Sequence, residues 1–256
     1  MTYREKMELA VRAAYAAGAM LKQYRNLHID RKSKNDYVTD ADRASEKLIR
    51  GMVLGTCPED GFYGEESGVE GGNKRGMWVV DPIDGTTNFI HHIPPYTISV
   101  GYMMDGQPVA GAVYAPLTDE MFCACKDGGA YLNGKPIHVS DTTDPQSCVL
   151  GMSFAHRNPE CSARMFELIP RLLPKINDMR RLGSAAYDLC CVACGRYDAF
   201  IELHLNLYDI AAGVIIAREA GAVTEGWYEE GDCLETGHTF VTTPGLRDWL
   251  RKEVEK

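Results

Sequence analysis

The pattern of strand and helix signals changes near residue 140, and this change restricts the fold of the chain more than any other feature. Short apolar segments between residues 77 and 137 are separated by turn signals such as Asp105-Gly106, which is typical of antiparallel hairpins. After residue 140, strand and helix signals alternate, which favours helices layered on a sheet. We therefore expect an N-terminal α+β half (residues 1–140, two helices and an antiparallel sheet) and a C-terminal α/β half (residues 141–256), packed as one body.

The predicted elements follow from apolar periods and from helix caps. Residues 3–25 repeat apolar and small side chains at helical spacing, and Thr39 followed by Asp42 indicates the start of a second helix. The polar stretch 30–36 between these helices suits a loop. The remaining predicted strands lie at residues 78–80, 96–104, 108–114, 121–125, 147–153, near 179, 198–203 and 238–242, and the remaining helices at 160–173, 184–194, 210–220 and the C-terminus.

The composition argues against several classes of protein. A formal net charge of −9 disfavours binding to nucleic acid or to an anionic membrane surface. The longest apolar runs are too short to span a bilayer, and the N-terminal residues carry both charge signs, unlike a signal peptide. The nine cysteines do not supply the two C-x₂-C pairs of a zinc site, so we interpret them as core thiols of a reducing compartment. We therefore expect a cytoplasmic protein with neither a nucleic-acid nor a membrane partner.

The segment 78–89 brings two carboxylates to one place. A buried strand ends at Asp81, and Pro82 fixes the backbone and supplies no N–H, so we expect the chain to leave its strand ladder there. The Ile83 carbonyl is then free to point outwards, and Asp84 returns a second carboxylate to the same side. Oxygen ligands of this kind suit Mg²⁺, Mn²⁺ or Ca²⁺ and not zinc.

The residues that follow favour a phosphate group. Gly85 leaves room for a ligand to approach the backbone, and Thr86 and Thr87 stand where a helix can begin, with free N–H groups. An Asp-capped helix after an ordinary strand-to-helix turn explains the same residues without a ligand. Residues 81–84 alone are weak evidence for a metal and phosphate site, and the full string 81–89 is much more specific for one.

Two other segments supply acids in comparable settings. Glu65 and Glu66 follow an aromatic pair and precede a glycine-rich loop, whereas Asp209 stands at the start of an apolar helix. A solvated loop and a helix N-cap are the structural explanations of these two segments. Together with Asp81 and Asp84, they predict a site of four carboxylates, which would raise one another's pKa unless cations compensate.

The strings 64–67 (Gly-Glu-Glu-Ser), 81–89 and 208–213 resemble the signatures of the inositol monophosphatase family, in order and in spacing. The resemblance extends from Asp36 to the last helix. It implies a layered αβαβα sandwich of the sugar-phosphatase type with a mixed C-terminal sheet. It also implies a phosphoric monoester hydrolase that depends on Mg²⁺, is inhibited by lithium and forms a homodimer.

The resemblance assigns the metal ligands residue by residue. Glu65, Asp81 and the Ile83 carbonyl would hold the first Mg²⁺. Asp81, Asp84 and Asp209 would hold the second, a third ion could use Glu65, and Mn²⁺ could substitute.

It also assigns the catalytic and substrate contacts. Thr86, working with Asp42, would orient and deprotonate the attacking water, while the N–H groups of Gly85 and Thr86 would hold the phosphate. The segment 183–185 and Glu202 resemble segments that contact the alcohol part of the substrate. The residues implied to contact the substrate are Asp84, Gly183, Ser184, Ala185, Glu202 and Asp209.

Substrate choice is predicted less sharply than chemistry. The continuation 86–89 resembles the inositol phosphatase branch, so a small phosphorylated polyol, myo-inositol monophosphate, is the expected substrate, cleaved by metal-activated water. Fructose 1,6-bisphosphatase or dual sugar phosphatase activity is the alternative, with Arg157, Arg180 and Arg181 as candidates to hold a second phosphate. A 3′-nucleotidase, a histidinol phosphatase and a non-enzymatic interaction protein are further alternatives.

Two positions depart from the family pattern. Tyr208 stands where the family usually has tryptophan, and the lysine-containing loop matches loosely, with Lys32 or Lys34 as the corresponding residue. Three histidines near the predicted site receive no role: His91, His92 and His204.

Overall fold

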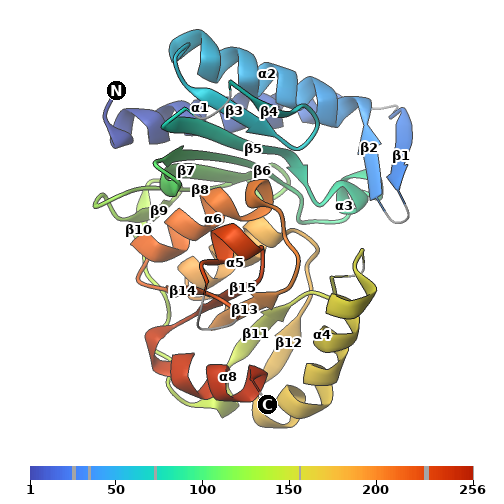
Figure 1. Cartoon of the computed structure of the whole chain (residues 1–256), viewed down its shortest axis with the longest axis vertical. Helices are drawn as coiled ribbons and strands as arrows, with labels where there is room; N and C mark the ends of the chain where they lie inside the picture. Colours follow the sequence, from blue (N-terminus) through green and yellow to red (C-terminus); the bar gives the residue numbers. More distant parts are fainter. Residues whose placement is uncertain (25–26, 34–35, 72–73, 156, 228–230, 256) are drawn as a thin grey trace.

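The chain folds into five layers, in the order helix, sheet, helix, sheet, helix (Figure 1). The predicted αβαβα architecture, with a mixed C-terminal sheet, is confirmed. No helix in the described ranges is both long and apolar enough to cross a bilayer. The computed structural model describes residues 1–24, 27–33, 36–71, 74–155, 157–227 and 231–255.

The first layer consists of two capped helices that pack on each other and on the first sheet. Thr2 and Thr39 are the N-caps, and each forms a reciprocal capping box with the acid three residues later. The apolar stripe of the first helix contains small residues such as Ala10 and Ala17, which let the helix lie close to the strands. The two helices are α1 (Tyr3–Leu21) and α2 (Asp40–Thr56).

The second layer is a sheet of eight strands within the described residues, in the order β10-β9-β8-β7-β6-β5-β3-β4. All its neighbouring strands are antiparallel except β3 and β5, which pair in parallel. The long strands are buried on both faces because helices cover the sheet on both sides. The strands are β3 (Gly61–Gly64), β4 (Gly68–Glu70), β5 (Gly76–Asp84), β6 (Thr97–Met104), β7 (Gln107–Ala115), β8 (Glu120–Cys125), β9 (Ala130–Leu132) and β10 (Lys135–Ile137).

The third layer lies between the two sheets, and the middle turns of its helices are largely apolar. Its helices pack on each other, and between them they contact strands of both sheets. A helix that is apolar all round is expected where every face meets protein. The two helices are α5 (Ala185–Ala193) and α6 (Leu207–Glu219).

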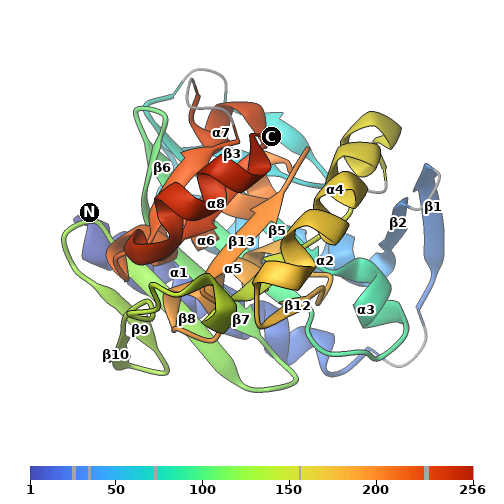
Figure 2. The ribbon, with the colours of Figure 1, turned by 90° about the horizontal axis from the view of Figure 1, so that it is seen from below.

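The fourth layer is a mixed sheet of five strands in the described part of the chain, and two outer helices cover its far face (Figure 2). Its strand order is β12-β11-β13-β15-β14, with parallel pairs on both sides of β11 and antiparallel pairs on both sides of β15. The elements are β11 (Val149–Met152), β12 (Asp178–Arg180), β13 (Ala199–Glu202), β14 (Val223–Gly226), β15 (Thr239–Thr242), α4 (Pro159–Leu172) and α8 (Arg247–Val254).

The prediction of a loop over residues 30–36 is wrong for most of this segment. Residues 29–33 and 36–39 form strands β1 and β2, which pair antiparallel beside the first sheet. Backbone ladders do not require apolar side chains, so a polar hairpin of this kind carries little apolar signal. The side chain of Lys32 and the whole of Lys34 lie outside the described residues.

Several short elements were not anticipated because they are too brief to show a period. Strands β3, β4 and β14 belong to this group. The remaining elements are β1 (Ile29–Ser33), β2 (Asp36–Thr39), α3 (Thr86–Ile90), α7 (Cys233–Thr236) and the 3₁₀ turns Pro145–Ser147, Leu173–Lys175 and Pro244–Leu246.

Candidate active site

A pocket with a volume of about 520 Å³ lies where β5, α3, α5, β13 and α6 meet. It is lined from both halves of the chain, so the two sheets and the helical layer between them together form its walls. Asp42 reaches the pocket through Thr86. The predicted site residues that line it are Glu65, Asp81, Ile83, Asp84, Gly85, Thr86, Gly183, Ser184, Ala185, Glu202 and Asp209.

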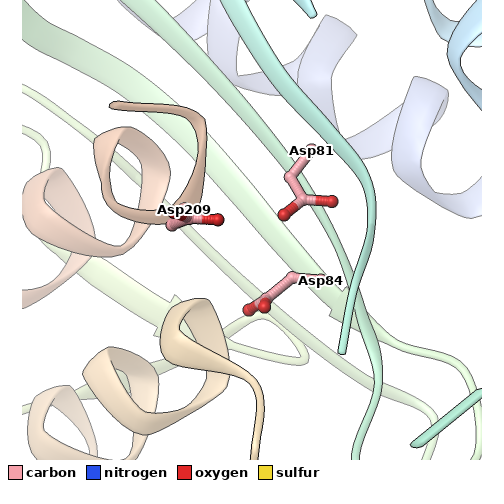
Figure 3. A group of neighbouring side chains, drawn as sticks. All are labelled: Asp81, Asp84 and Asp209. Atoms are coloured by element: carbon pink, nitrogen blue, oxygen red, sulfur yellow. The ribbon is translucent and has the colours of Figure 1, made fainter. Parts of the chain in front are cut away.

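Three carboxylates converge in this pocket (Figure 3). Asp81 and Asp84 come from the end of β5 and Asp209 from the first turn of α6, and one oxygen from each lies within 4.8 Å of the others. The prediction that the chain leaves its ladder at Pro82 is half right. The pairing of β5 with β6 is interrupted after Asp81 and resumes at Asp84, opposite Thr97. This interruption lets both carboxylates face the pocket.

The start of α6 orients the third carboxylate. Asn206 is the N-cap, and Asp209 occupies the third helical position, where its Oδ2 accepts a hydrogen bond of 2.6 Å from the Asn206 N–H. The structural explanation of Asp209 as the N-cap is therefore wrong by three positions. Because this bond uses one carboxylate oxygen, the other oxygen remains available to a ligand.

Burial and mutual repulsion act on all three carboxylates. Loss of solvation raises the pKa of Asp81, and the charges of Glu65 and Asp84 raise it further. Loss of solvation also raises the pKa of Asp209, with Asp84 as the main charged neighbour. The pKa of Asp84 is raised by burial, against the opposing hydrogen bonds from Ser184 Oγ and the backbone of Ala186. Three crowded oxygen ligands that resist ionisation fit a hard divalent cation, which would relieve the repulsion.

Glu65 lies at the edge of this group and is positioned by its own loop. Its N–H donates to the Val80 carbonyl at 3.1 Å, which ties the residue to β5. Glu46, buried on α2, accepts hydrogen bonds from the N–H groups of Glu66 at 2.8 Å and Ser67 at 2.9 Å. Sequence reasoning missed Glu46, although a glutamate inside the apolar stripe of a predicted helix is a signal of a buried acceptor.

Thr86 is held between two acceptors. Its hydroxyl lies 3.3 Å from Asp42 Oδ1 and 3.1 Å from the Ile83 carbonyl. The fully buried Asp42 also accepts from the Thr39 N–H at 2.8 Å, so α2 holds the carboxylate rigidly. Gly85, at φ +91°, precedes α3 in a left-handed conformation that a side chain would strain.

The start of α5 closes the pocket from the other side. Ser184 caps this helix, and its hydroxyl donates to Asp84 Oδ2 at 2.7 Å. The Ala186 N–H donates to the same oxygen at 2.8 Å. Ser184, predicted as a substrate contact, is therefore already bonded to a carboxylate. Gly183 has a φ of +90°, and its carbonyl oxygen lies close to Gly85. A Cβ added at Gly85 would be 3.0 Å from that oxygen.

Two further carboxyls lie in the pocket wall near α5 and β13. Burial raises the pKa of Glu202 to about 7, and Glu202 is 9% exposed. Asp188 is 2% exposed, and burial raises its pKa well above the usual range, with the charge of Glu202 adding to the effect. Sequence reasoning missed Asp188, whose signal is an isolated acid in a helix that is otherwise apolar.

The cationic candidates separate into two groups. Arg157 and Arg181 line the pocket, whereas Arg180 forms an ion pair with Asp178 on the surface, outside it. His204 lines the pocket, and His91 and His92 are not among its lining residues. Tyr208, which replaces the expected tryptophan, also lines the pocket and packs edge-on against Tyr63 at 5.6 Å between ring centroids.

Comparison with known proteins agrees with this geometry. The sequence pattern of the inositol monophosphatase family matches residues 3–256. The Nus factor SuhB of Xylella fastidiosa is 38% identical over 219 residues, which cover 84% of this chain and 79% of that protein. The inositol-1-monophosphatase of Mesorhizobium japonicum is 35% identical over 255 residues, which cover 98% of this chain and 96% of that protein.

Solved structures agree as well. The crystal structure of the extragenic suppressor protein suhB from Bartonella henselae superposes with a TM-score of 0.93 at 33% identity, over 98% of this chain and 99% of that chain. The family is metal-dependent, which accords with three converging acids that could bind a metal ion. From its sequence, its fold and its acidic pocket, the chain belongs to the inositol monophosphatase family.

Proposed function

We propose that this protein hydrolyses small phosphomonoesters with Mg²⁺ as cofactor, and that myo-inositol monophosphate is its preferred substrate. The observation that carries this proposal is the convergence of Asp81, Asp84 and Asp209, whose oxygens lie within 4.8 Å of one another. The same pocket is lined by the hydroxyl of Thr86 and by the buried carboxyl of Glu202. Two relatives, at 35% and 34% identity, are named inositol-1-monophosphatase, which supports the choice of substrate.

The acidic residues would hold the cations. Glu65, Asp81 and the second lone pair of the Ile83 carbonyl would bind one Mg²⁺. Asp81, Asp84 and Asp209 would bind another, and a third ion could use Glu65. When bound, divalent cations supply positive charge that lowers the pKa of water and stabilises the charge of the phosphate during displacement.

Thr86 and Asp42 would handle the proton of the attacking water. Because Thr86 donates its hydroxyl proton to Asp42, a lone pair on Oγ1 remains free to accept a proton from water. The same hydroxyl lies 3.1 Å from the Ile83 carbonyl, which places it beside the carboxylates. The chain therefore orients a water molecule without needing a covalent nucleophile.

The remaining lining residues would bind the substrate. The N–H groups of Gly85 and Thr86 would hold the phosphate, because α3 begins there and the first N–H groups of a helix have no partner within the helix. Glu202 would accept a hydrogen bond from a hydroxyl of the alcohol part. Asp84, held by Ser184 and Ala186, would lie between these two regions.

A phosphate-release panel tests the proposal. The substrates are myo-inositol 1-phosphate, fructose 1,6-bisphosphate, histidinol phosphate and phosphoadenosine phosphate, each with and without Mg²⁺ and Li⁺. We expect Mg²⁺-dependent release, fastest from the inositol ester and reduced by Li⁺. The Asp81→Asn variant should lose turnover by about three orders of magnitude while its circular dichroism spectrum stays native, because an essential ligand is lost. No release from any ester would refute the proposal.

The panel also decides between the main candidate and a sugar bisphosphatase. Arg157 and Arg181 line the pocket, and a guanidinium suits bidentate binding of a second phosphate. Faster release from fructose 1,6-bisphosphate, lost in Arg181→Gln, would favour this second candidate.

A third candidate is a role shared with the relatives named Nus factor SuhB, which are 34–38% identical to this chain. Since Glu65, Asp81, Asp84 and Asp209 all line the pocket, such a role would accompany catalysis. A native, metal-binding protein that releases phosphate from no ester would favour the Nus role alone.

A further inference from the structure

Asp188 is a buried acid in the pocket wall that is neither one of the proposed metal ligands nor one of the groups proposed to move the proton of water. It lies on α5, four residues after the N-cap Ser184, and lines the pocket together with Glu202 of β13. Its side chain is 2% exposed. Among the described residues, no hydrogen-bond partner satisfies its Oδ1. A buried carboxyl oxygen without a donor lowers the stability of the fold.

The charges around Asp188 do little to stabilise its carboxylate. Glu202 and Asp84 carry like charge, and Arg181 is the cation that opposes them. The Tyr197 hydroxyl lies near enough to lower the pKa of Asp188, yet neither Oδ1 nor this hydroxyl reaches hydrogen-bond geometry with any described residue. Tyr197 is not among the residues that line the pocket. Because Asp188 itself lines the pocket, a hydroxyl of a molecule bound there is a donor that could reach this carboxyl.

We propose that Asp188 is a specificity-determining residue that hydrogen-bonds a hydroxyl of the alcohol part of the substrate, next to the hydroxyl bound by Glu202. The proposal rests on the proposed function and deepens it. Two carboxyls from neighbouring elements, α5 and β13, then recognise two hydroxyls of one ester. The substrate class that fits is the phosphate monoester of a polyhydroxylated alcohol.

The chemistry of the wall favours this class over a simple alkyl phosphate. The Ser184 hydroxyl already donates its proton to Asp84, and Ser153 lies close enough to Glu202 to lower the pKa of that carboxyl. An ester whose alcohol part has no hydroxyls would place only carbon atoms against the carboxyl groups of Asp188 and Glu202. Both carboxyl groups would then lack a hydrogen-bond donor from the ester. A site built to bond a hydroxyl rejects the analogue that lacks it, because its own polar groups are then stranded.

Two esters on the same carbon ring test the proposal: myo-inositol 1-phosphate and cyclohexyl phosphate, which lacks the hydroxyls. We expect Asp188→Ala to lower kcat/KM at least about tenfold for the inositol ester and less than about twofold for the cyclohexyl ester. Asp188→Asn, which keeps the shape, should show a smaller loss of the same selectivity. Both variants should unfold at a higher temperature than the wild type, since an unpaired buried carboxyl is removed.

Tyr197→Phe is the matched control, because it removes an unpartnered hydroxyl that lies near Asp188 but does not line the pocket. It should leave the ratio of the two kcat/KM values unchanged. An equal loss on both esters in Asp188→Ala and Asp188→Asn, no loss in either, or the same selective loss in Tyr197→Phe would overturn the role of Asp188. Release from neither ester by the wild type would instead overturn the proposed function on which this role rests.

Discussion

Replacing Glu46 by glutamine tests how the loop that carries Glu65 is positioned. The two carboxylate oxygens of Glu46 each accept one backbone hydrogen bond, from Glu66 at 2.8 Å and from Ser67 at 2.9 Å. Glu46 is 4% exposed, and Gly64 allows it to approach because a Cβ at that glycine would collide with its carboxylate. The amide of glutamine can accept one of these bonds but turns a second donor towards the other N–H.

The expected cost follows from those two bonds. One hydrogen bond to a charged acceptor is lost and a partly buried N–H is left facing a donor, so Glu46→Gln should lower the free energy of unfolding by about 2 kcal/mol. Because the loop also carries Glu65, its displacement should weaken divalent-cation binding by about tenfold, as loss of an outer ligand partner commonly does.

Urea unfolding in chelator measures the first effect, and calorimetric titration with Mn²⁺ measures the second. Glu8→Gln on α1 is the control, since Glu8 is an exposed helical glutamate and should change neither quantity by more than about 0.5 kcal/mol. An unchanged free energy of unfolding would refute the hydrogen-bond reasoning. A stability loss with wild-type Mn²⁺ affinity would refute the connection between Glu46 and Glu65.

Two other predictions concern stability. The folded protein retains the Glu202 proton up to a pKa of about 7, whereas the unfolded chain releases it near 4.5, so this contribution to stability is present below 4.5 and is lost as the pH rises through 7. Urea unfolding of the metal-free protein should show a fall in this window that is smaller by about 3 kcal/mol in Glu202→Gln, and identical pH slopes in the two proteins would contradict the assignment. Lys6 pairs with Asp60 and lies 4.2 Å from the centroid of the Tyr102 ring, with both charged side chains buried, so Lys6→Met should destabilise by about 3 kcal/mol. Asp60→Asn added to Lys6→Met should recover part of that loss in the same assay; if it recovers none, the stranded-charge explanation fails.

Helix caps and long apolar periods made much of the fold predictable. The Thr39–Asp42 capping box and the apolar stretch before Gly221 are local patterns, and α2 and α6 form where these patterns indicate. The hairpin of β1 and β2 escaped prediction because its stability comes from pairing between strands with polar side chains. The short edge strands β4 and β14 escaped for the related reason that three or four residues carry no measurable period.

The candidate site divides in the same way. Asp81, Asp84 and Glu65 belong to short sequence motifs that can be recognised without the fold, and each of them lines the pocket. Glu46 and Asp188 stand in no such string. Their part in the site depends on which backbone groups and which neighbours reach them across the fold.

The amino-acid sequence alone therefore determined which acidic side chains are available to a metal ion, the order of the helices and most strands, and the family that the chain resembles, because these properties belong to short stretches of chain. Tertiary structure decided that Asp209 meets Asp81 and Asp84 within 4.8 Å, and that Arg181 faces the pocket while Arg180 does not. It also decided that one buried acid, Asp188, lacks a donor among the described residues. These facts depend on distances between segments far apart in the chain, which no local pattern encodes.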